Sequence, residues 1–191
     1  IQTGLLIPKK ISKDIQRKVP YRDHFSYLKN FANSNPNAFL KALPPTHPEY
    51  ARLQREKLKF ERIVARNSWG TSLGSAQLEP GDTGKQVIKL RNRLIAMGYL
   101  KRNLRRKYDS KLQAAVTSFQ KDHGLNSDGV AGPATLSELN TPAKRRLQSI
   151  IVAMERMRWS NKDLGDRHIL VNLTDFTAKI VQNDEVTFRT R

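Results

Sequence analysis

The chain has 191 residues, of which 35 are Lys or Arg and 17 are Asp or Glu, so its formal net charge is +18 at pH 7. Hydrophobic residues make up 38% of the sequence, which suffices for one or two modest cores but not for one large core. The absence of Cys excludes disulfide scaffolds, thiolate zinc sites and a cysteine nucleophile within these residues. The longest apolar run, 150–154, is far shorter than the roughly 20 residues that cross a bilayer. The sequence therefore predicts no transmembrane segment.

The charge excess indicates polyanionic partners. A strongly basic protein attracts nucleic acid, anionic lipid or bacterial envelope polymers over long distances, so charge alone leaves all three open. The sequence starts at Ile1 without an initiator Met and without a charged-then-apolar leader. This start is compatible with export after removal of a signal segment.

The first third of the chain predicts a basic arm followed by a helical scaffold. Residues 1–23 are basic with few apolar side chains, which favours an arm or an early helix. Residues 24–77 predict two short helices on either side of the turn signal at 33–37. A longer helix is then expected from Tyr50 to about Arg66, followed by a linker rich in Gly and Ser at 67–74.

Residues 78–141 predict a compact module of three short helices. Apolar residues recur at helical spacing up to Gly98, which is expected to close the first helix. Ser110 followed by Gln113 predicts a capping box at the start of the second helix. Pro133 suits the first turn of the third helix, where no amide donor is needed. Three apolar stripes of this kind can bury one another.

The last part predicts a helix and then strands. Residues 142–164 form an amphipathic helix to about Trp159, with Met154 and Trp159 expected in a core. Within 165–191 the apolar period changes to two, which predicts strands with a hairpin turn at Asn183-Asp184. Because so few strands do not form a stable sheet alone, we expect the sequence to end inside a β-rich domain. The predicted fold class is mainly α, with the three-helix module inserted in a helical scaffold and followed by the first β-strands of an incomplete β-rich catalytic domain.

Residues 78–140 contain a pattern of glycines, aromatic and apolar residues at characteristic spacing. The pattern is Leu78, Gly81-Asp82-x-Gly84, Val87, Leu90, Leu94, Gly98-Tyr99, Tyr108-Asp109, Ala115-Val116, Phe119-Gln120, Gly124-Leu125, Asp128-Gly129, Gly132, Thr135 and Leu139-Asn140. With this pattern the segment resembles the peptidoglycan-binding domain that accompanies many bacterial cell-wall enzymes. The sequence departs from the family at Arg91, where Gln is frequent, and at Leu112, where Thr is usual. We expect these departures to preserve the fold, and they could alter a binding surface.

The flanks resemble L,D-transpeptidases of the YkuD type. Residues 155–159, then 168–172 and Phe176, are similar to the entry of that catalytic domain, and 43–69 resembles the helical scaffold of its large periplasmic, YcbB-like members. The resemblance implies a periplasmic or envelope-associated enzyme that cross-links peptidoglycan stem peptides. Its thiolate attacks meso-diaminopimelate of a donor stem, D-alanine leaves, and an amine of a neighbouring stem resolves the acyl-enzyme. The Cys and His of that motif are expected downstream, so no catalytic residue is assigned here.

Candidate ligand-binding residues lie within the three-helix module, with Gln120 and Arg93 the weaker candidates. They are Asp82, Arg93, Tyr99, Tyr108, Asp109, Gln120 and Asp128. The aspartates could contact sugar hydroxyls or stem amines, but we favour their capping of helices and turns. The two tyrosines could stack on sugar rings, but we favour packing.

Other candidate sites are weaker. The basic run 101–107 could dock on wall carboxylates or other anionic envelope polymers, or could be a solvated face. The four histidines lack the paired spacing of metal ligands. We therefore expect no metal site and no cofactor.

Two alternatives remain beside peptidoglycan binding. A basic three-helix protein could bind nucleic acid in the manner of a helix-turn-helix domain. Against this, the helix expected at 133–140 would expose only Ser137 and Glu138. A non-catalytic structural protein of the wall is the other alternative. The predicted partner is peptidoglycan, through its stem peptides or its glycan, and not nucleic acid.

Overall fold

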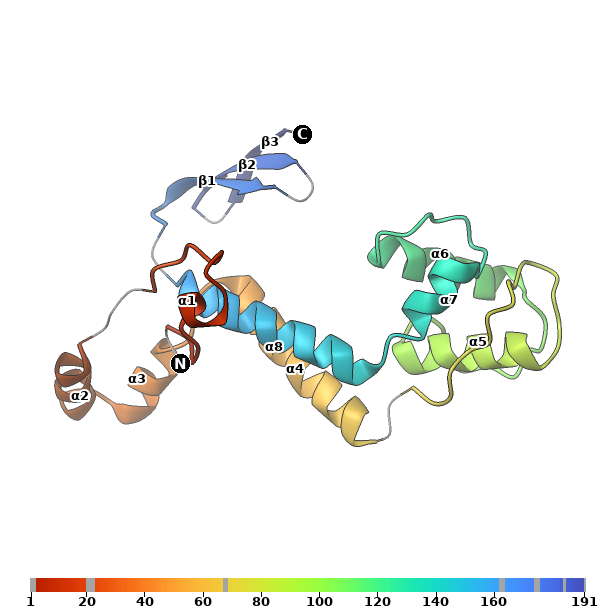
Figure 1. The fold of residues 1–191 in the computed structure, drawn as a ribbon, viewed down its shortest axis with the longest axis horizontal. Coiled ribbons are helices and arrows are strands. Elements are labelled where there is room, and N and C mark those ends of the chain that lie inside the picture. Colours follow the sequence, from red (N-terminus) through yellow and green to blue (C-terminus); the bar gives the residue numbers. More distant parts are fainter. Residues whose placement is uncertain are drawn as a thin grey trace. The chain divides into compact units, whose positions relative to one another are not determined.

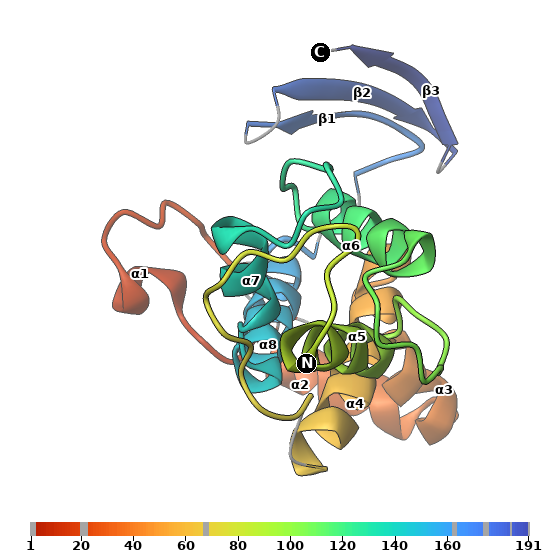
Figure 2. The same cartoon turned by 90° about the vertical axis from the view of Figure 1, so that its right-hand side faces the viewer.

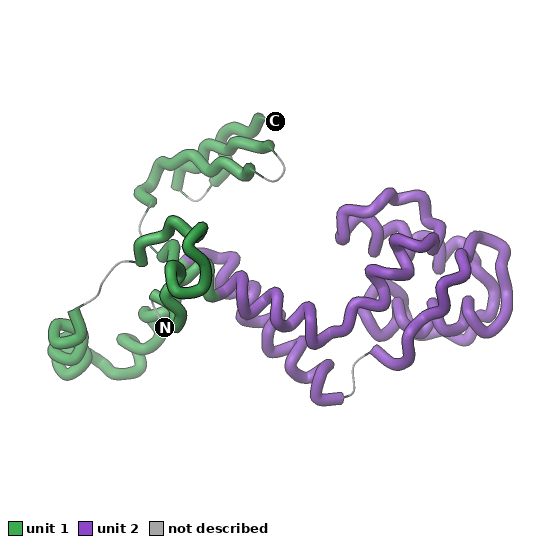
Figure 3. Tube along the Cα trace, viewed as in Figure 1, with its two compact units in different colours: residues 1–46, 155–191 green, residues 47–154 purple. Residues whose placement is uncertain are grey.

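The computed structural model describes residues 3–19, 23–66, 69–161, 164–173, 176–183 and 185–190. The described residues form eight helices followed by three strands (Figure 1). This confirms the prediction of a mainly helical chain with strands at its end. The chain divides into two compact units, residues 1–46 with 155–191 as unit 1 and residues 47–154 as unit 2 (Figure 3).

The first helices of unit 1 confirm the two short helices predicted around the turn at 33–37. Unit 1 contains α1 (Pro8–Ile11), α2 (His24–Ala32) and α3 (Pro36–Ala42). Helix α2 begins after Asp23, whose carboxylate accepts two backbone N–H bonds, and α3 begins after Asn35, whose side chain accepts one. The ring of Phe39 contacts Tyr27 and Phe31 edge-on, at centroid distances of 6.0 and 5.5 Å. These aromatic contacts hold the helix pair together.

A buried carboxylate fixes the start of the chain to the end of α8 (Ala143–Trp159). Oε1 of Glu155 accepts hydrogen bonds from the backbone N–H groups of Leu5 at 2.6 Å and Leu6 at 2.8 Å. The same oxygen accepts a bond from Nε1 of Trp159 at 3.0 Å. Gly4 has φ +88°, and a Cβ there would lie 2.5 Å from Glu155 Oε1. The basic arm therefore has a specific partner that its own sequence does not indicate.

The strands form an antiparallel sheet in the order β1-β2-β3. They are β1 (Arg167–Asn172), β2 (Thr177–Gln182) and β3 (Glu185–Thr190). Ile180 lies opposite Ile169 on one side and Phe188 on the other. Both of these neighbours are more than half exposed, whereas Val181 on the opposite face is buried. Of the predicted hairpin turn, Asn183 has a positive φ of 51°, and Asp184 lies outside the described residues.

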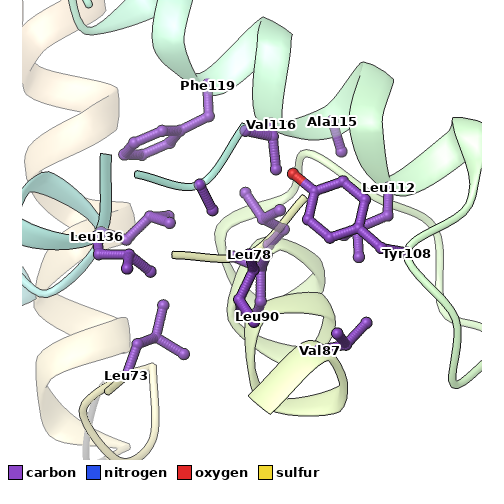
Figure 4. Close-up of a cluster of buried hydrophobic side chains, with 13 residues drawn as sticks. Leu73, Leu78, Val87, Leu90, Tyr108, Leu112, Ala115, Val116, Phe119 and Leu136 are labelled. Atoms are coloured by element: carbon purple, nitrogen blue, oxygen red, sulfur yellow. The ribbon is translucent and has the colours of Figure 1, made fainter. Parts of the chain in front are cut away.

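Unit 2 contains the three-helix module. The helices of unit 2 are α4 (Pro48–Ala65), α5 (Lys85–Met97), α6 (Ser110–Asp122), α7 (Pro133–Leu139) and the first part of α8, and the module consists of α5, α6 and α7. Figure 2 shows α5, α6 and α7 gathered together. They bury a shared apolar cluster, shown in Figure 4, of Leu73, Leu78, Val87, Leu90, Leu94, Tyr108, Leu112, Ala115, Val116, Phe119, Ala131, Leu136 and Leu139. The apolar stripes read from the sequence supply this core.

The segment before the module packs against it. Leu73 belongs to the module's core cluster, and its backbone N–H donates to Asn140 Oδ1 at 2.8 Å while Asn140 Nδ2 donates back to its carbonyl at 3.1 Å. Arg93 donates to the carbonyls of Leu139 at 2.6 Å and Thr71 at 2.7 Å. Residues 69–74 are thus hydrogen-bonded to the module, although the sequence predicts a linker there. Asn67 and Ser68 of that linker lie outside the described residues.

The ends of the module helices follow the sequence signals with one exception. Gly98 closes α5 in the left-handed conformation, at φ 89°. The predicted capping box at Ser110 is wrong, because Asp109 occupies the N-cap position and accepts a bond from Leu112 N at 3.0 Å. Arg91 holds the Asp109 carboxylate in that position with a 2.9 Å ion pair. An acceptor fixed by a buried cation therefore replaces the hydroxyl of Ser110.

Candidate functional site

Gln120, a predicted ligand residue, lies at the centre of an internal hydrogen-bond network. Its side chain is 1% exposed. The Nε2 group donates to Asp128 Oδ1 at 2.8 Å, Val130 O at 2.9 Å and Thr135 Oγ1 at 3.0 Å. Oε1 accepts the backbone N–H of Gly129 at 2.8 Å. This side chain fixes the turn at 128–130, and its polar atoms are taken up by that turn.

The other polar candidates have internal partners as well. Tyr108 is 1% exposed and donates its hydroxyl to Gly129 O at 2.8 Å; burial raises its pKa, so it remains a donor. Asp82 Oδ2 accepts the N–H of Glu79 at 2.8 Å, and Asp109 caps α6. Together with the internal bonds of Arg93 and Asp128, these contacts support the interpretation that these residues build turns and caps.

Tyr99 is a predicted ligand residue that lines hollows on unit 2. It is half-buried, packs edge-on against Phe119 at a centroid distance of 5.4 Å, and donates its hydroxyl to Asp122 Oδ2 at 3.1 Å. Burial, together with the nearby Asp122, raises the pKa of Tyr99 to about 12. Two separate hollows of unit 2 include Tyr99 in their walls.

The first, here called the aromatic hollow, has a volume of about 500 Å³. Its apolar lining includes Phe60, Trp69, Tyr99, Met97 and Ile150, with the fully buried Phe119 behind Tyr99. The Phe60 and Trp69 rings meet edge-on at a centroid distance of 5.8 Å, and Trp69 is 9% exposed. Flat apolar walls of this kind suit methyl groups, sugar faces or other compact apolar groups.

Charged residues also line the aromatic hollow. The guanidinium of Arg146 donates to the backbone carbonyl of Glu138 at 2.9 Å and lies 3.0 Å from the carboxylate of the same residue. The Arg146 guanidinium lies 5.7 Å from the centroid of the Trp69 ring, at cation–π distance. His123 Nδ1 lies 3.3 Å from the Glu138 carboxylate. Sequence reasoning missed these residues, because none of them belongs to the motif that carries the resemblance.

His123 predicts a measurable dependence of stability on pH. Burial first, and then the charge of Arg146, lower the pKa of His123 below its ordinary value of 6.5. Because the unfolded chain then binds the proton more tightly, the stability that the neutral ring contributes is complete above pH 6.5 and is lost as pH falls below it. We expect the Tm to fall between pH 7.5 and 5.5 in the native chain and to fall less in His123→Gln.

Thermal unfolding at several pH values checks this expectation. A carboxylate such as Asp128, whose pKa is lowered from 3.8 first by the backbone N–H of Val130, acts at more acid pH and does not contribute in this window. An unchanged slope in His123→Gln would assign the effect to another group.

The second space, here called the basic hollow, lies beside α6 and has a volume of about 450 Å³. Lys101, Arg102, Arg105 and Lys111 contribute to its lining, together with Tyr99. Among the described residues that line it there is no Asp or Glu. Arg105 is paired with Asp109 at 3.2 Å. The predicted basic run thus borders a concave surface that favours anions.

In the part of the chain that the structure describes, no helix combines the length and the apolar character needed to span a bilayer. Within the same described ranges, no group of three or more His, Asp or Glu side chains is placed to hold a metal ion.

Comparison with known proteins gives matches to parts of the chain. The family model of a scaffold domain matches residues 1–56. Among solved structures, "The crystal structure of SleB N-terminal domain" is 24% identical over a match that covers 44% of this chain and 99% of that chain, with a TM-score of 0.32. A TM-score this low does not assign the fold of the chain. No curated protein matches.

The three-helix module has its own match. The family model of the peptidoglycan binding domain matches residues 83–139, which span α5, α6 and α7. This match supports peptidoglycan as a partner of the chain and an association with the cell wall or envelope.

Proposed function

We propose that this chain binds peptidoglycan in the bacterial envelope and forms the wall-binding and scaffold region of a YkuD-type, YcbB-like L,D-transpeptidase. The observation that carries the proposal is the match of residues 83–139 to the peptidoglycan binding domain. The scaffold-domain match over 1–56 supports a scaffold region only. The L,D-transpeptidase part of the proposal rests on the resemblance of the 155–159 segment to the entry of that catalytic domain. Peptidoglycan binding and the L,D-transpeptidase assignment together place the proposed chain in the periplasm.

The surface of unit 2 fits this proposal chemically. Peptidoglycan combines sugar rings and small aliphatic side chains with free carboxylates on its stem peptides. The aromatic hollow offers flat apolar walls, and the basic hollow offers cations without acidic neighbours in its described lining. The basic hollow also fits other anionic polymers of the envelope, which would raise the local concentration of the chain at the wall.

The acyl transfer of the parent enzyme needs a nucleophile from outside these residues, since the sequence contains no Cys. The contribution of this region is then to hold the enzyme on its polymeric substrate. Binding energy from such a remote contact raises the local concentration of stem peptides at the catalytic centre.

The net charge of +18 makes nucleic acid the principal competing partner. The short helix α7 is a poor reader of base edges, because Glu138 is engaged by Arg146 and only small side chains such as Ala134 and Ser137 are exposed. Binding to DNA would therefore be confined to phosphate contacts, which weaken steeply with salt.

Binding of the full chain to two polymers tests the proposal. Purified sacculi and duplex DNA are each titrated at about 50 and 200 mM salt, the range in which phosphate-dominated binding falls steeply. We expect saturable binding to sacculi at both salt concentrations and weak, salt-sensitive binding to DNA. Tight DNA binding without sacculus binding would replace the proposal by the nucleic-acid alternative. Binding to neither polymer would favour a purely structural role.

A further inference from the structure

The aromatic hollow extends beyond the part of the chain that matches the peptidoglycan binding domain. Tyr99 and Phe119 lie within residues 83–139, but Phe60 comes from α4 and Arg145 comes from α8. Trp69 belongs to the segment whose backbone carbonyls, those of Gly70 and Thr71, accept hydrogen bonds from Arg93 of the module. All of these residues lie in unit 2. The site is therefore composite, and the three-helix module alone supplies only one side of it.

The charges around this hollow differ in their availability. Glu138 engages Arg146 at 3.0 Å, and Lys59 lies 3.2 Å from Glu56. The side chain of Arg145 is exposed, and among the described residues it has no ion-pair or hydrogen-bond partner. Of the cations that line the hollow, Arg145 is thus the one whose guanidinium is available to an incoming carboxylate. Arg is suited to this role because its fork of N–H donors matches the two carboxylate oxygens.

We propose that the aromatic hollow holds a stem peptide of peptidoglycan, with a free carboxylate on Arg145 and the alanine methyl groups against Phe60 and Trp69. The proposal rests on the proposed function and names the part of the polymer that is bound. A volume of about 500 Å³ falls in the range of small-ligand sites. A glycan strand is a poorer occupant, because its hydroxyl and amide groups offer no free carboxylate to the Arg145 guanidinium.

The test uses the full chain, purified sacculi and a soluble stem tetrapeptide with free carboxylates. Arg145→Gln removes the guanidinium, and Lys144→Gln is the matched control, because Lys144 is exposed on the same helix and its replacement changes the net charge equally. We expect calorimetry to show an affinity for the tetrapeptide about 10-fold lower in Arg145→Gln. We expect Lys144→Gln to remain within about twofold of the native chain.

A second variant tests the composite nature of the site. Phe60→Leu removes the α4 ring from the hollow while keeping an apolar side chain of moderate size on the half-buried helix face. We expect affinity for the tetrapeptide to fall about fivefold, with the Tm measured in parallel to confirm folding. Unchanged affinity in either Phe60→Leu or Arg145→Gln would overturn the proposed site.

The outcomes separate this inference from the function on which it rests. If the native chain binds no sacculi, the proposed function fails. If the native chain binds sacculi but Arg145→Gln binds both sacculi and tetrapeptide equally well, the function stands and the site is wrong. Glycan strands that an amidase has freed of their stem peptides should not bind. Full binding to such stripped glycan would identify the sugar strand as the ligand and overturn the inference.

Discussion

Replacing Arg91 by Met is expected to lower the free energy of unfolding by about 3 kcal/mol, because the change breaks a buried ion pair at one partner. The Arg91 side chain is 1% exposed. It donates to Asn103 Oδ1 at 2.8 Å, Lys107 O at 2.7 Å and Asp109 Oδ1 at 2.9 Å. Met has a similar length but no donor, so it leaves the Lys107 carbonyl without this bond and loosens the carboxylate that caps α6.

Urea unfolding followed by circular dichroism measures this loss. Lys89→Met on the exposed face of the same helix is the control, and we expect it to change the free energy of unfolding by less than about 0.5 kcal/mol. A loss below about 1 kcal/mol in Arg91→Met would show that Arg91 is not an anchor of the loop at 101–109.

Replacing Gln120 by Leu is the second change with a large expected effect, a loss of about 3 kcal/mol. Leu fits an apolar core, but it leaves the N–H of Gly129 without an acceptor and the carbonyl of Val130 without its side-chain donor. The turn at 128–130 also carries the bond from Tyr108 to Gly129 O. Disorder of this turn would therefore reach the core of the module.

The same substitution at an exposed glutamine separates this network from a general effect of Gln→Leu. Gln86 is exposed on α5, and Gln86→Leu is expected to be nearly neutral. Equal losses in Gln86→Leu and Gln120→Leu would contradict the assigned role of the network. Hydrogen exchange at the amide of Gly129 provides a local check, because that amide should lose protection only in Gln120→Leu.

The helices of the module were predictable because local signals agree with the final packing. The apolar stripes, Gly98 at the end of α5 and Pro133 at the start of α7 all act within a few residues of their positions. The cap of α6 was not predictable in the same way. Asp109 and Ser110 are both good caps, and the choice depends on Arg91, which is 18 residues away in sequence.

The candidate site shows a similar division. Sequence reasoning selects polar residues at turns, but a buried turn also needs polar side chains to satisfy its backbone. Gln120 and Asp128 make such internal hydrogen bonds, and their contact with a ligand stays a prediction. Phe60, Trp69 and Arg145 come together only in the folded chain, where α4 and α8 meet the module. In the sheet, the alternation of apolar residues predicts the strands but not which face is buried. Ile169, on the face expected to be apolar, is 67% exposed, whereas Val181 is 6% exposed.

Co-sedimentation of the full chain with purified sacculi is the most direct measurement of peptidoglycan binding. We expect a saturable isotherm at about 150 mM salt, where exposed charges separated by more than about 8 Å are largely screened from one another. The affinity should be reduced in Arg145→Gln and retained in Lys144→Gln. A native chain that remains in the supernatant at every concentration of sacculi, while its thermal unfolding shows it to be folded, would contradict peptidoglycan binding.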